Sequence, residues 1–432
     1  MAESKDIAAY KKELKELMQN KGIASKAVGN AKKNGLSYNN LIADVQDISK
    51  KIALLKKKIQ SNKAIKEEAA VCDELASIMP PQFSSRDEKL MADVSINSNP
   101  DMHIWDSYIA QHKNASIYHS SQIRSVIENS FGHTCYYLTA ENKAQKICGV
   151  LPLVELNSPL FGHFIVSVPF FNYGGVLADS SGIAQQLCEE AASLANSLGA
   201  QHIEYRHCYQ AVDMPARSDK IAMLLQLPSS VDVLWEQIGT KLRAQIKKPQ
   251  RQNTKTVVGR EELLDDYYKV FSCNMRDLGT PVYSKMFFKN MLKYNETANI
   301  VVVYLNGQPV STGFVLGWRN TLEIPWASTL RKANKHDVNM LLYWAVLQFA
   351  INEDYKVFDF GRSSKVANTY RFKKQWGAKP HQLYWHYWLP NNNEMPQINP
   401  DNPKYKLLIN AWKRLPVWLA NQIGPRLVKN IP

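Results

Sequence analysis

The most informative segment of the chain reads Phe358-Asp-Phe-Gly-Arg-Ser-Ser364 and then Tyr370-Arg-Phe-Lys-Lys-Gln-Trp-Gly377. It gathers an acid, two arginines, two lysines, hydroxyls and aromatic rings within about twenty residues. A purely structural strand and turn would not need this density of charged and aromatic groups. The segment is therefore a candidate site, and the alternative is a set of core aromatics beside solvated Lys and Arg.

The first half of this segment predicts a strand that ends in a turn. Alternation over Val357 to Phe360 predicts that Val357 and one phenylalanine are buried while Asp359 points to the other face. Gly361 allows a tight turn that projects Arg362. A strand end that presents an acid and an arginine beside a turn is a frequent place for a functional site.

The second half supplies cations between aromatic rings. Lys373 and Lys374 follow Phe372, and Tyr370 and Trp376 can stack on a planar group. An ammonium at this place can stabilise the oxyanion that forms when an acyl carbonyl is attacked.

Size and charge limit the class of protein. A chain of 432 residues is long enough for two or three domains. The net charge of +14 predicts an anionic partner: nucleic acid, a sugar nucleotide, a phosphate or an anionic bilayer. The six cysteines form no CxxC pair and no zinc-ligand spacing, which predicts reduced thiols and no metal. The charged N-terminal sequence and the absence of a long apolar run predict a cytoplasmic protein.

Residues 1–70 predict a basic helical hairpin. They carry fifteen lysines against eight acidic residues. Apolar or small residues recur at alternating spacings of three and four, which is typical of a coiled coil. The segment Lys33-Asn-Gly-Leu-Ser37 supplies a turn, with Ser37 as the expected helix cap. The hairpin resembles the tRNA-binding arm of seryl-tRNA synthetase, and the alternative is a dimerisation or spacer coiled coil that allows self-association.

After a predicted linker, residues 71–89, the chain alternates β-rich runs with amphipathic helices. This mixture predicts an α/β (α+β) fold. Segments 193–206 and 347–362 share an outline of helix, turn and charged strand end, which indicates an internal duplication. The expected strands are 146–154, 164–168, 202–205, 300–305, 308–316, 321–326 and 357–360, and the expected helices are 121–129, 182–198, 261–274, 284–293 and 338–352.

The ordered motifs of this region resemble the FemAB-like branch of the GNAT superfamily, in particular members associated with exopolysaccharide and exosortase systems. The resemblance spans roughly residues 90–432. Besides the segment quoted first, the motifs are Trp105-Asp106, Tyr118-His119, Phe131-Gly-His133, Gly149-Val-Leu-Pro-Leu153, Pro169-Phe-Phe-Asn-Tyr-Gly-Gly175 and Asn274-Met-Arg-Asp-Leu-Gly-Thr-Pro281.

The resemblance implies two tandem GNAT-like domains with mixed sheets, residues 90–227 and 228–392, and transfer of an acyl or aminoacyl group to an amine. The predicted catalytic residues are Lys373, which the resemblance implies as the residue that stabilises the transition state, and Asp359. The residues expected to bind substrate are Arg362, Tyr370, Arg371, Lys374, Trp376, Tyr173, Arg124 and Arg206.

Two segments depart from the family pattern. In residues 120–127 the expected Trp is replaced by Ile123, and Arg124 alone supplies a nearby positive charge. This leaves open whether peptidoglycan is the acceptor. Residues 331–337 lack the glycines of the loop with which GNAT enzymes hold the pyrophosphate of acetyl-CoA. The departure favours aminoacyl-tRNA as donor, while an acyl carrier or another thioester remains open.

Two further segments are basic. Residues 241–251 read KLRAQIKKPQR, which is either a phosphate-contacting run or a solvated helix face. Residues 393–432 form an amphipathic basic C-terminal segment. Within it, residues 403–432 interleave Trp and Leu with Lys and Arg, which predicts either peripheral contact with the cytoplasmic leaflet or docking on the protein body.

The sequence therefore predicts a cytoplasmic acyl or aminoacyl transferase that forms an amide on an amine of a nucleotide- or lipid-linked cell-envelope precursor. No cofactor or metal is expected, because the acyl group arrives as an activated ester or thioester. The alternatives are a thioester-dependent N-acyltransferase that acts on an amino sugar or lipid-linked glycan, and a tRNA- or RNA-binding scaffold without activity.

Overall fold

The computed structural model describes residues 2–76, 94–365, 367–390, 395–396 and 403–431. The chain forms two compact units, an arm (Met1–Ile78) and a body (Met79–Pro432). The body contains two mixed sheets flanked by helices, which confirms the predicted fold class. Of the predicted linker, residues 71–76 continue the second helix of the arm, and residues 77–89 lie outside the described part.

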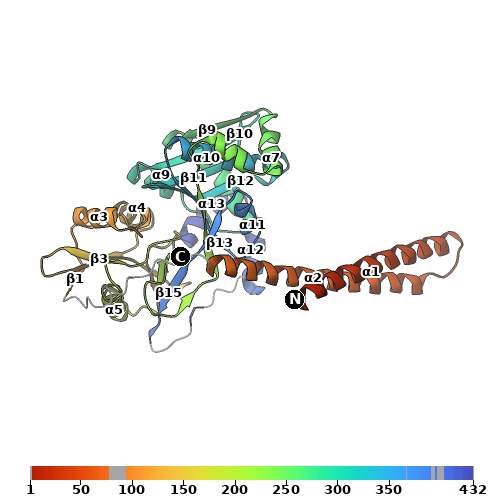
Figure 1. The fold of residues 1–432 in the computed structure, drawn as a ribbon, viewed down its shortest axis with the longest axis horizontal. Coiled ribbons are helices and arrows are strands. Elements are labelled where there is room, and N and C mark those ends of the chain that lie inside the picture. The colour runs from red at the N-terminus through yellow and green to blue at the C-terminus, as the bar shows by residue number, and fades with distance from the viewer. Residues whose placement is uncertain (1, 77–93, 366, 391–394, 397–402, 432) are drawn as a thin grey trace. The chain divides into compact units, whose positions relative to one another are not determined.

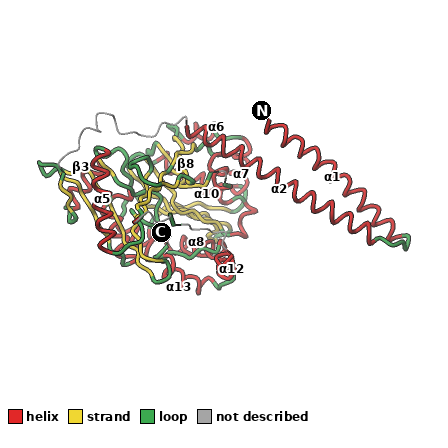
Figure 2. The backbone as a smooth tube through the Cα atoms, turned by 90° about the horizontal axis from the view of Figure 1, so that it is seen from below, coloured by secondary structure: helices red, strands yellow, loops and turns green. Residues whose placement is uncertain are grey.

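The arm is a hairpin of two long helices, α1 (Ala2–Lys33) and α2 (Asn39–Ala76), which lie side by side in Figures 1 and 2. The turn contains Gly35 with a φ of 68°, a left-handed backbone that glycine adopts without steric cost. Where the helices pack, the buried side chains are those of Ala31, Ile52, Leu55 and Ile59. The predicted hairpin is confirmed, but Ser37 is not its cap, because α2 begins two residues later.

The first sheet of the body has the strand order β1-β2-β3-β4-β6-β15-β7, with β5 paired to β3. Strands β4 and β6 are connected through α5 and pair in parallel. The strands are β1 (Ser95–Asn97), β2 (Cys135–Glu141), β3 (Ile147–Ser158), β4 (Gly162–Val166), β5 (Leu177–Ala178), β6 (Ile203–His207), β7 (Ala216–Arg217) and β15 (Tyr384–Trp388), and the helices of this half are α3 (Met102–Gln111), the 3₁₀ helix η2 (Ile117–His119), α4 (Ser121–Phe131) and α5 (Ser181–Leu198).

The second sheet has the order β14-β8-β13-β12-β11-β10-β9. Strands β12 and β13 are connected through α10 and pair in parallel. The strands are β8 (Lys220–Gln226), β9 (Thr254–Gly259), β10 (Ala298–Leu305), β11 (Gln308–Trp318), β12 (Thr321–Thr329), β13 (Val357–Ser364) and β14 (Lys379–Gln382), and the helices are α6 (Val231–Gln237), α7 (Thr240–Gln250), η3 (Glu261–Leu263), α8 (Leu264–Leu278), α9 (Lys285–Tyr294), η4 (Arg331–His336), α10 (Val338–Asn352) and α11 (Asn368–Lys374).

The two halves of the body repeat one arrangement. In each, two strands that pair in parallel are separated in the chain by one long helix: β4 and β6 by α5, with the short β5 before the helix, and β12 and β13 by α10. Segments 193–206 and 347–362 occupy matching places, because both run from the helix (α5 or α10) into the parallel strand (β6 or β13). We therefore treat the charged ends of β6 and β13 as structurally equivalent.

The two sheets exchange strands. Strand β8 pairs with β13 and β14 of the second sheet, although it precedes residue 227 in the chain. Strand β15 follows the second sheet in the chain but pairs with β6 and β7 of the first. A single hydrophobic core cluster also continues from Tyr118 in the first half to Phe287 in the second. Residues from both halves can therefore line one site.

The C-terminal segment forms α12 (Pro403–Trp412) and α13 (Val417–Val428). Helix α13 packs on α8 through buried Ala420, Gly424 and Val428. Gly424 permits the close approach, since a Cβ there would lie 2.8 Å from the backbone nitrogen of Val282. The segment thus docks on the body through one of its faces.

Candidate active site

Two acidic side chains meet where the parallel strands of the second sheet diverge. Glu323 of β12 and Asp359 of β13 are paired positions at the end of a three-residue parallel ladder. Beyond this pair, β12 and β13 continue without pairing to each other. Both side chains are buried, with exposed fractions of 5% and 4%.

The burial of Asp359 differs from the prediction for this strand. Both Phe358 and Phe360 are buried, whereas Val357 is only half-buried. Asp359 does point to the face opposite the phenylalanines, but that face is covered as well, because Tyr173 of the first half packs on it. The carboxylate therefore lies inside the body.

Three of the four hydrogen-bond donors to these carboxylates come from the first half of the body. Tyr118 donates to Glu323 Oε2 at 2.6 Å, and Asn172 donates to its Oε1 at 2.9 Å. Tyr173 donates to Asp359 Oδ2 at 2.6 Å, and the backbone N–H of Gly361 donates to Oδ1 at 2.7 Å. The carboxyl pair is thus held between the two halves by four donors.

Burial determines the protonation of this pair. It raises the pKa of Glu323 well above its ordinary value, and the neighbouring charge of Asp359 raises it further. Burial also raises the pKa of Asp359, against the opposing effects of its hydrogen bonds from Tyr173 and Gly361 and of the Lys373 charge. Two adjacent carboxyls in a low-dielectric site titrate as one unit. We therefore expect the pair to retain one proton near neutral pH.

Lys373 completes this group from α11. Its side chain is buried, and Nζ donates to the carbonyls of Gly361 at 3.0 Å and Arg362 at 2.8 Å. The pairing register with β8 shifts between Asp359 and Arg362, and Gly361 has a left-handed φ of 73°. This bulge is a consequence of glycine at that position, and both carbonyl acceptors lie in it. Burial lowers the pKa of Lys373 to about 8, although Asp359 and Glu323 oppose the change.

The other predicted residues of α11 surround Lys373 without joining the carboxyl pair. Tyr370 is buried, and Lys374 Nζ lies 3.1 Å from its hydroxyl. Arg371 is exposed and contacts Asn368. Trp376 is buried beside Phe372 and Tyr343, so it packs in the core and presents no open face for a substrate. Of these residues, only Lys373 reaches into the site.

The loop after β4 delivers the contacts from the first half. Within it, Val168 and Phe170 have φ values of 63° and 75°. A β-branched or bulky residue in the left-handed region is strained, and such strain persists only where the surroundings enforce it. This loop positions Asn172 and Tyr173 on the carboxyl pair, and its Phe171 carbonyl accepts from Arg206 at 2.6 Å.

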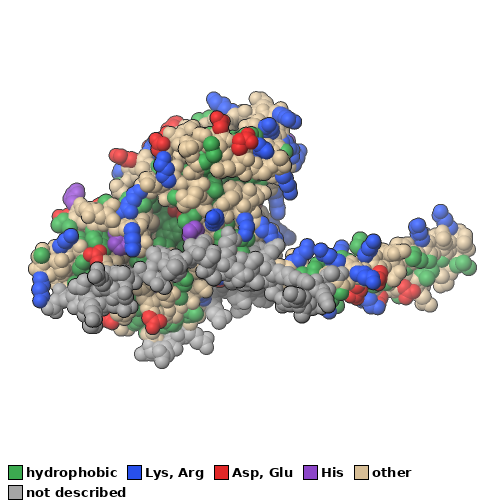
Figure 3. Space-filling model, viewed as in Figure 1, with side chains coloured by type: hydrophobic (Ala, Val, Ile, Leu, Met, Phe, Trp, Pro, Cys, Tyr) green, Lys and Arg blue, Asp and Glu red, His purple; other side chains and the backbone are tan. Residues whose placement is uncertain are grey.

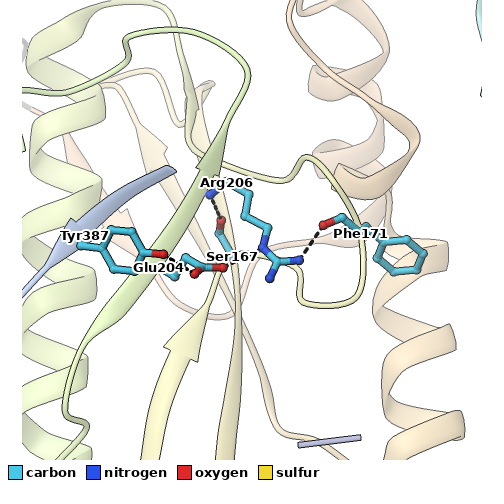
Figure 4. Close-up of polar contacts among 5 residues, drawn as sticks. All are labelled: Ser167, Phe171, Glu204, Arg206 and Tyr387. Atoms are coloured by element: carbon cyan, nitrogen blue, oxygen red, sulfur yellow. Dashed lines mark hydrogen bonds and ion pairs between the residues drawn. The ribbon is translucent and has the colours of Figure 1, made fainter. Parts of the chain in front are cut away.

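The equivalent strand end in the first half carries a buried ion pair (Figure 4). Arg206 Nε lies 2.8 Å from Glu204 Oε1, and both side chains are almost completely buried. Tyr387 of β15 donates to the other Glu204 oxygen at 2.5 Å, and the Arg206 backbone N–H donates to Ser167 at 2.8 Å. Arg206 is therefore buried, and Figure 4 shows its side chain reaching from β6 to the Phe171 carbonyl.

The two predicted arginines Arg206 and Arg362 come together on one indole. Their guanidinium carbons lie 4.5 Å and 4.9 Å from the ring centre of Trp385 in β15. Unlike Arg206, Arg362 is solvent-exposed and has no acidic ion-pair partner among the described residues. The protein atoms packed around one side of its guanidinium lower its pKa by partial desolvation, and repulsion from Arg206 lowers the pKa further. The pair forms a positive site with one exposed guanidinium.

Arg124 is not brought to this site. It pairs with Glu128 one turn later on α4, at 2.9 Å, and lies over the ring of Tyr137. Its role here is to stabilise α4 and cover the core. The described residues also contain no cluster of His, Cys, Asp or Glu that could hold a metal ion.

The start of α10 differs from a pyrophosphate-binding loop. Asp337 occupies the N-cap with a left-handed φ of 56°, and its carboxylate lies 2.7 Å from Lys248 Nζ. An acid at a helix N-terminus takes the place where a phosphate would otherwise be favoured. The segment that lacks the glycines in sequence thus also differs in structure from a pyrophosphate-binding loop, because an acidic side chain lies at the helix N-terminus.

Sequence reasoning missed several residues of the site, namely Glu323, Asn172, Glu204 and Trp385. Glu323 lies in a strand whose neighbours are apolar, and an acid between Leu322 and Ile324 was an available signal. Tyr118 was noted only as part of a motif. The partners of Glu323 come from the other half of the body, so no local pattern could join them; Glu204 and Arg206 lie in one strand, but the tyrosine that donates to Glu204 comes from distant β15.

Comparison with known proteins identifies a domain that contains this site. Residues 240–374 match the model of the acetyltransferase (GNAT) domain, and this range includes Glu323, Asp359 and Lys373. The search of the curated proteins found no match.

Three solved structures are similar to this chain to different degrees. FemX is similar over 73% of this chain and 100% of its own, with 10% identity and a TM-score of 0.53. The L-PGS of Bacillus licheniformis covers 74% of this chain and 100% of its own, with 12% identity and a TM-score of 0.45. A tandem GNAT protein from the clavulanic acid biosynthesis pathway covers 70% and 100%, with 10% identity and a TM-score of 0.45.

Residues 240–374 therefore form a domain of the acetyltransferase (GNAT) family, as the matched model shows. More particularly, the body has the FemAB-like fold that FemX also has.

Proposed function

We propose that this protein transfers an acyl or aminoacyl group to an amine of a cell-envelope precursor. The observation that carries the proposal is the buried group of Glu323, Asp359 and Lys373 at the divergence of β12 and β13. A buried acid and a buried amine with opposed pKa changes are typical of proton-transfer sites.

The chemistry follows from these charges. The acceptor amine must lose a proton as its nitrogen attacks the acyl carbonyl, and the carboxylate of Asp359 is the group in this site that can take it. Lys373, still protonated near neutral pH, stabilises the negative charge that develops on the carbonyl oxygen. The C–N bond forms, the bond to the donor oxygen or sulfur breaks, and that leaving group takes up a proton.

The positive site on Trp385 supports an anionic acceptor. Arg362 is exposed there, while Arg206 is fixed by Glu204 and adds charge from below. Planar guanidinium groups suit phosphate recognition. A nucleotide- or lipid-linked precursor would place its diphosphate on this surface, and its amine toward the carboxyl pair.

The structure of the α10 N-terminus supports a donor other than acetyl-CoA. Asp337 and the absence of glycine in η4 remove the usual pyrophosphate contacts. Aminoacyl-tRNA is our first choice of donor. The basic arm would then bind the RNA, and Figure 3 shows Lys and Arg side chains along its length. Self-association of the arm is the competing role, although its apolar positions pack within one chain.

We also propose that the C-terminal segment touches the anionic inner face of the plasma membrane. Leu407, Leu408 and Trp418 are exposed by 72%, 66% and 64%. Exposed Lys413 and Arg414 lie between them in the chain. Exposed apolar side chains next to cations are suited to a headgroup region. None of the described helices is long and apolar enough to cross a bilayer, so such contact would be peripheral.

Two experiments test these proposals. Radiolabelled aminoacyl-tRNA and acetyl-CoA are offered in parallel with envelope precursors, and the products are identified by mass spectrometry. We expect label to be transferred from aminoacyl-tRNA and this transfer to be lost in Asp359→Asn. Transfer from acetyl-CoA alone would mean that the donor is a thioester and not aminoacyl-tRNA. Turnover with neither donor would contradict the proposed function. Cosedimentation with phosphatidylglycerol vesicles tests the membrane contact, with Trp418→Ser as the variant and phosphatidylcholine as the control lipid.

A further inference from the structure

A second positively charged site lies on α7, away from the carboxyl pair. A pocket of about 420 Å³ is lined by Trp235, Thr240, Arg243, Ala244, Lys247, Lys248 and Arg251. Pockets of this volume are large enough for a nucleotide-sized ligand. Figure 3 shows Lys and Arg side chains gathered along the edge of the lobe where Figure 1 labels α7.

The positive charges of this pocket come from one face of the helix. The cations recur at intervals of four residues, which places them on one side of α7: Arg243 and Lys247 lie in the helix, and Arg251 is its C-cap. The buried residues Leu242 and Ile246 hold the opposite face on the body. The basic run 241–251 is therefore not a uniformly solvated surface, since part of its charge converges on a concave site.

The pocket carries more positive than negative charge. Lys248 is neutralised by Asp337 at 2.7 Å, and Arg243 has a long contact of 3.4 Å with Glu236. Lys247 and Arg251 have no acidic partner among the residues that the structure describes. Two cations thus remain available for an anionic ligand.

An aromatic wall accompanies these cations. Trp235 is half-buried, and its ring lies 5.0 Å from that of Trp344 in α10. Lys247 Nζ lies 5.4 Å from the centre of the Trp235 ring. Cations that follow a backbone, combined with an aromatic side chain that meets bases, are the usual features of a site for single-stranded nucleic acid.

The pocket adjoins the start of α10. Lys248 Nζ donates to the Lys335 carbonyl of η4 at 2.8 Å, and His336 contacts Gln252 just after α7. The diphosphate of a coenzyme A thioester would have to lie at the N-terminus of α10, where the carboxylate of Asp337 would repel it. A chain of separate phosphodiesters, each met by one Lys or Arg, requires no such backbone loop.

We propose that the α7 pocket binds a single-stranded segment of RNA, with phosphates on Lys247 and Arg251 and a base against Trp235. The inference rests on the proposed function, because the RNA would be the one that carries the acyl group. Binding at this place would hold the RNA beside the C-terminal GNAT domain and independently of the arm.

Direct binding tests this site without turnover. A fluorescein-labelled single-stranded RNA 12-mer is titrated into the full chain between 50 and 200 mM salt, and the anisotropy gives Kd. The variant carries Lys247→Gln and Arg251→Gln. The control is Lys241→Gln, which removes an exposed lysine of the same helix that does not line the pocket.

We expect the double variant to bind at least 10-fold more weakly at 100 mM salt, and the control to bind like the wild type. Loss of two phosphate contacts should also reduce the slope of log K against log salt by about 1.4. Equal affinities for variant and control would overturn the inference. So would a variant that loses coenzyme A binding and retains RNA binding. If RNA binding is unchanged while transfer from aminoacyl-tRNA persists, the pocket assignment fails and the proposed function stands.

Discussion

Replacement of Lys373 by Met should separate stability from activity. Burial lowers the pKa of Lys373 from 10.5 to about 8. A lysine pKa that is lower in the folded state means that the charged form is disfavoured there. The difference corresponds to about 3 kcal/mol of folding free energy. Attraction to Asp359 and Glu323 is already contained in this value, because both raise the pKa without outweighing burial.

The sign of the pH dependence follows from the two pKa values. Above the unfolded pKa near 10.5, the amine is neutral in both states and costs nothing. Below pH 8 the cost is complete. Methionine has a similar length and no charge. In this variant the carboxyl pair has no neighbouring cation, which raises the pKa of the pair further. We therefore expect the loss of the charge to give Lys373→Met a gain in stability over the wild type that is largest near pH 7 and disappears between pH 8 and pH 10.5, offset at every pH by the loss of the hydrogen bonds to the Gly361 and Arg362 carbonyls.

Urea unfolding at pH 7, 8.5 and 10 measures this gain. Tryptophan fluorescence reports on the body alone, because residues 1–78 contain no tryptophan. Lys374→Met is the matched control, since it removes the neighbouring exposed lysine of α11 and should show no such pH trend. Transfer activity should fall by at least about 100-fold in Lys373→Met only. A variant that is destabilised at pH 7 and shows no trend would make Lys373 a structural cation and refute the reasoning.

Four further substitutions, at three positions, address the site. The wild type should lose stability from pH 5 to pH 8, because the raised folded pKa of Glu323 gives stability that is complete below the unfolded pKa near 4.5 and is lost as the pH rises through the folded pKa. Glu323→Gln should remove this loss. If the melting temperatures of both proteins change with pH in the same way, the prediction is wrong. Gly361→Ala should cost about 1–2 kcal/mol in urea unfolding because of the φ of 73°, and Gly361→Asn should cost less; equal costs would exclude backbone strain as the cause. Glu204→Gln should cost about 3–5 kcal/mol because it leaves Arg206 buried without a counter-charge, and a cost below 1 kcal/mol would mean that the pair is dispensable.

Local patterns accounted for the elements of the fold. The long apolar segment 338–352 was predicted to be a helix, which agrees with the observed bounds of α10. The hairpin of the arm followed from heptads and the turn at Gly35. Pairing between distant segments did not follow: nothing in β8 or β15 indicates that each joins the sheet of the other half.

The site divides in the same way. The sequence by itself determined the residue types near the end of β13, with Asp359, Gly361 and Lys373 in a spacing that one strand and one short helix can bring together. Only the tertiary structure decided that Asp359 is buried, that Glu323 lies beside it, and that Tyr118 and Tyr173 donate to the pair. The physical reason is that charge and periodicity are local properties of a chain, whereas desolvation depends on which distant surface covers a group.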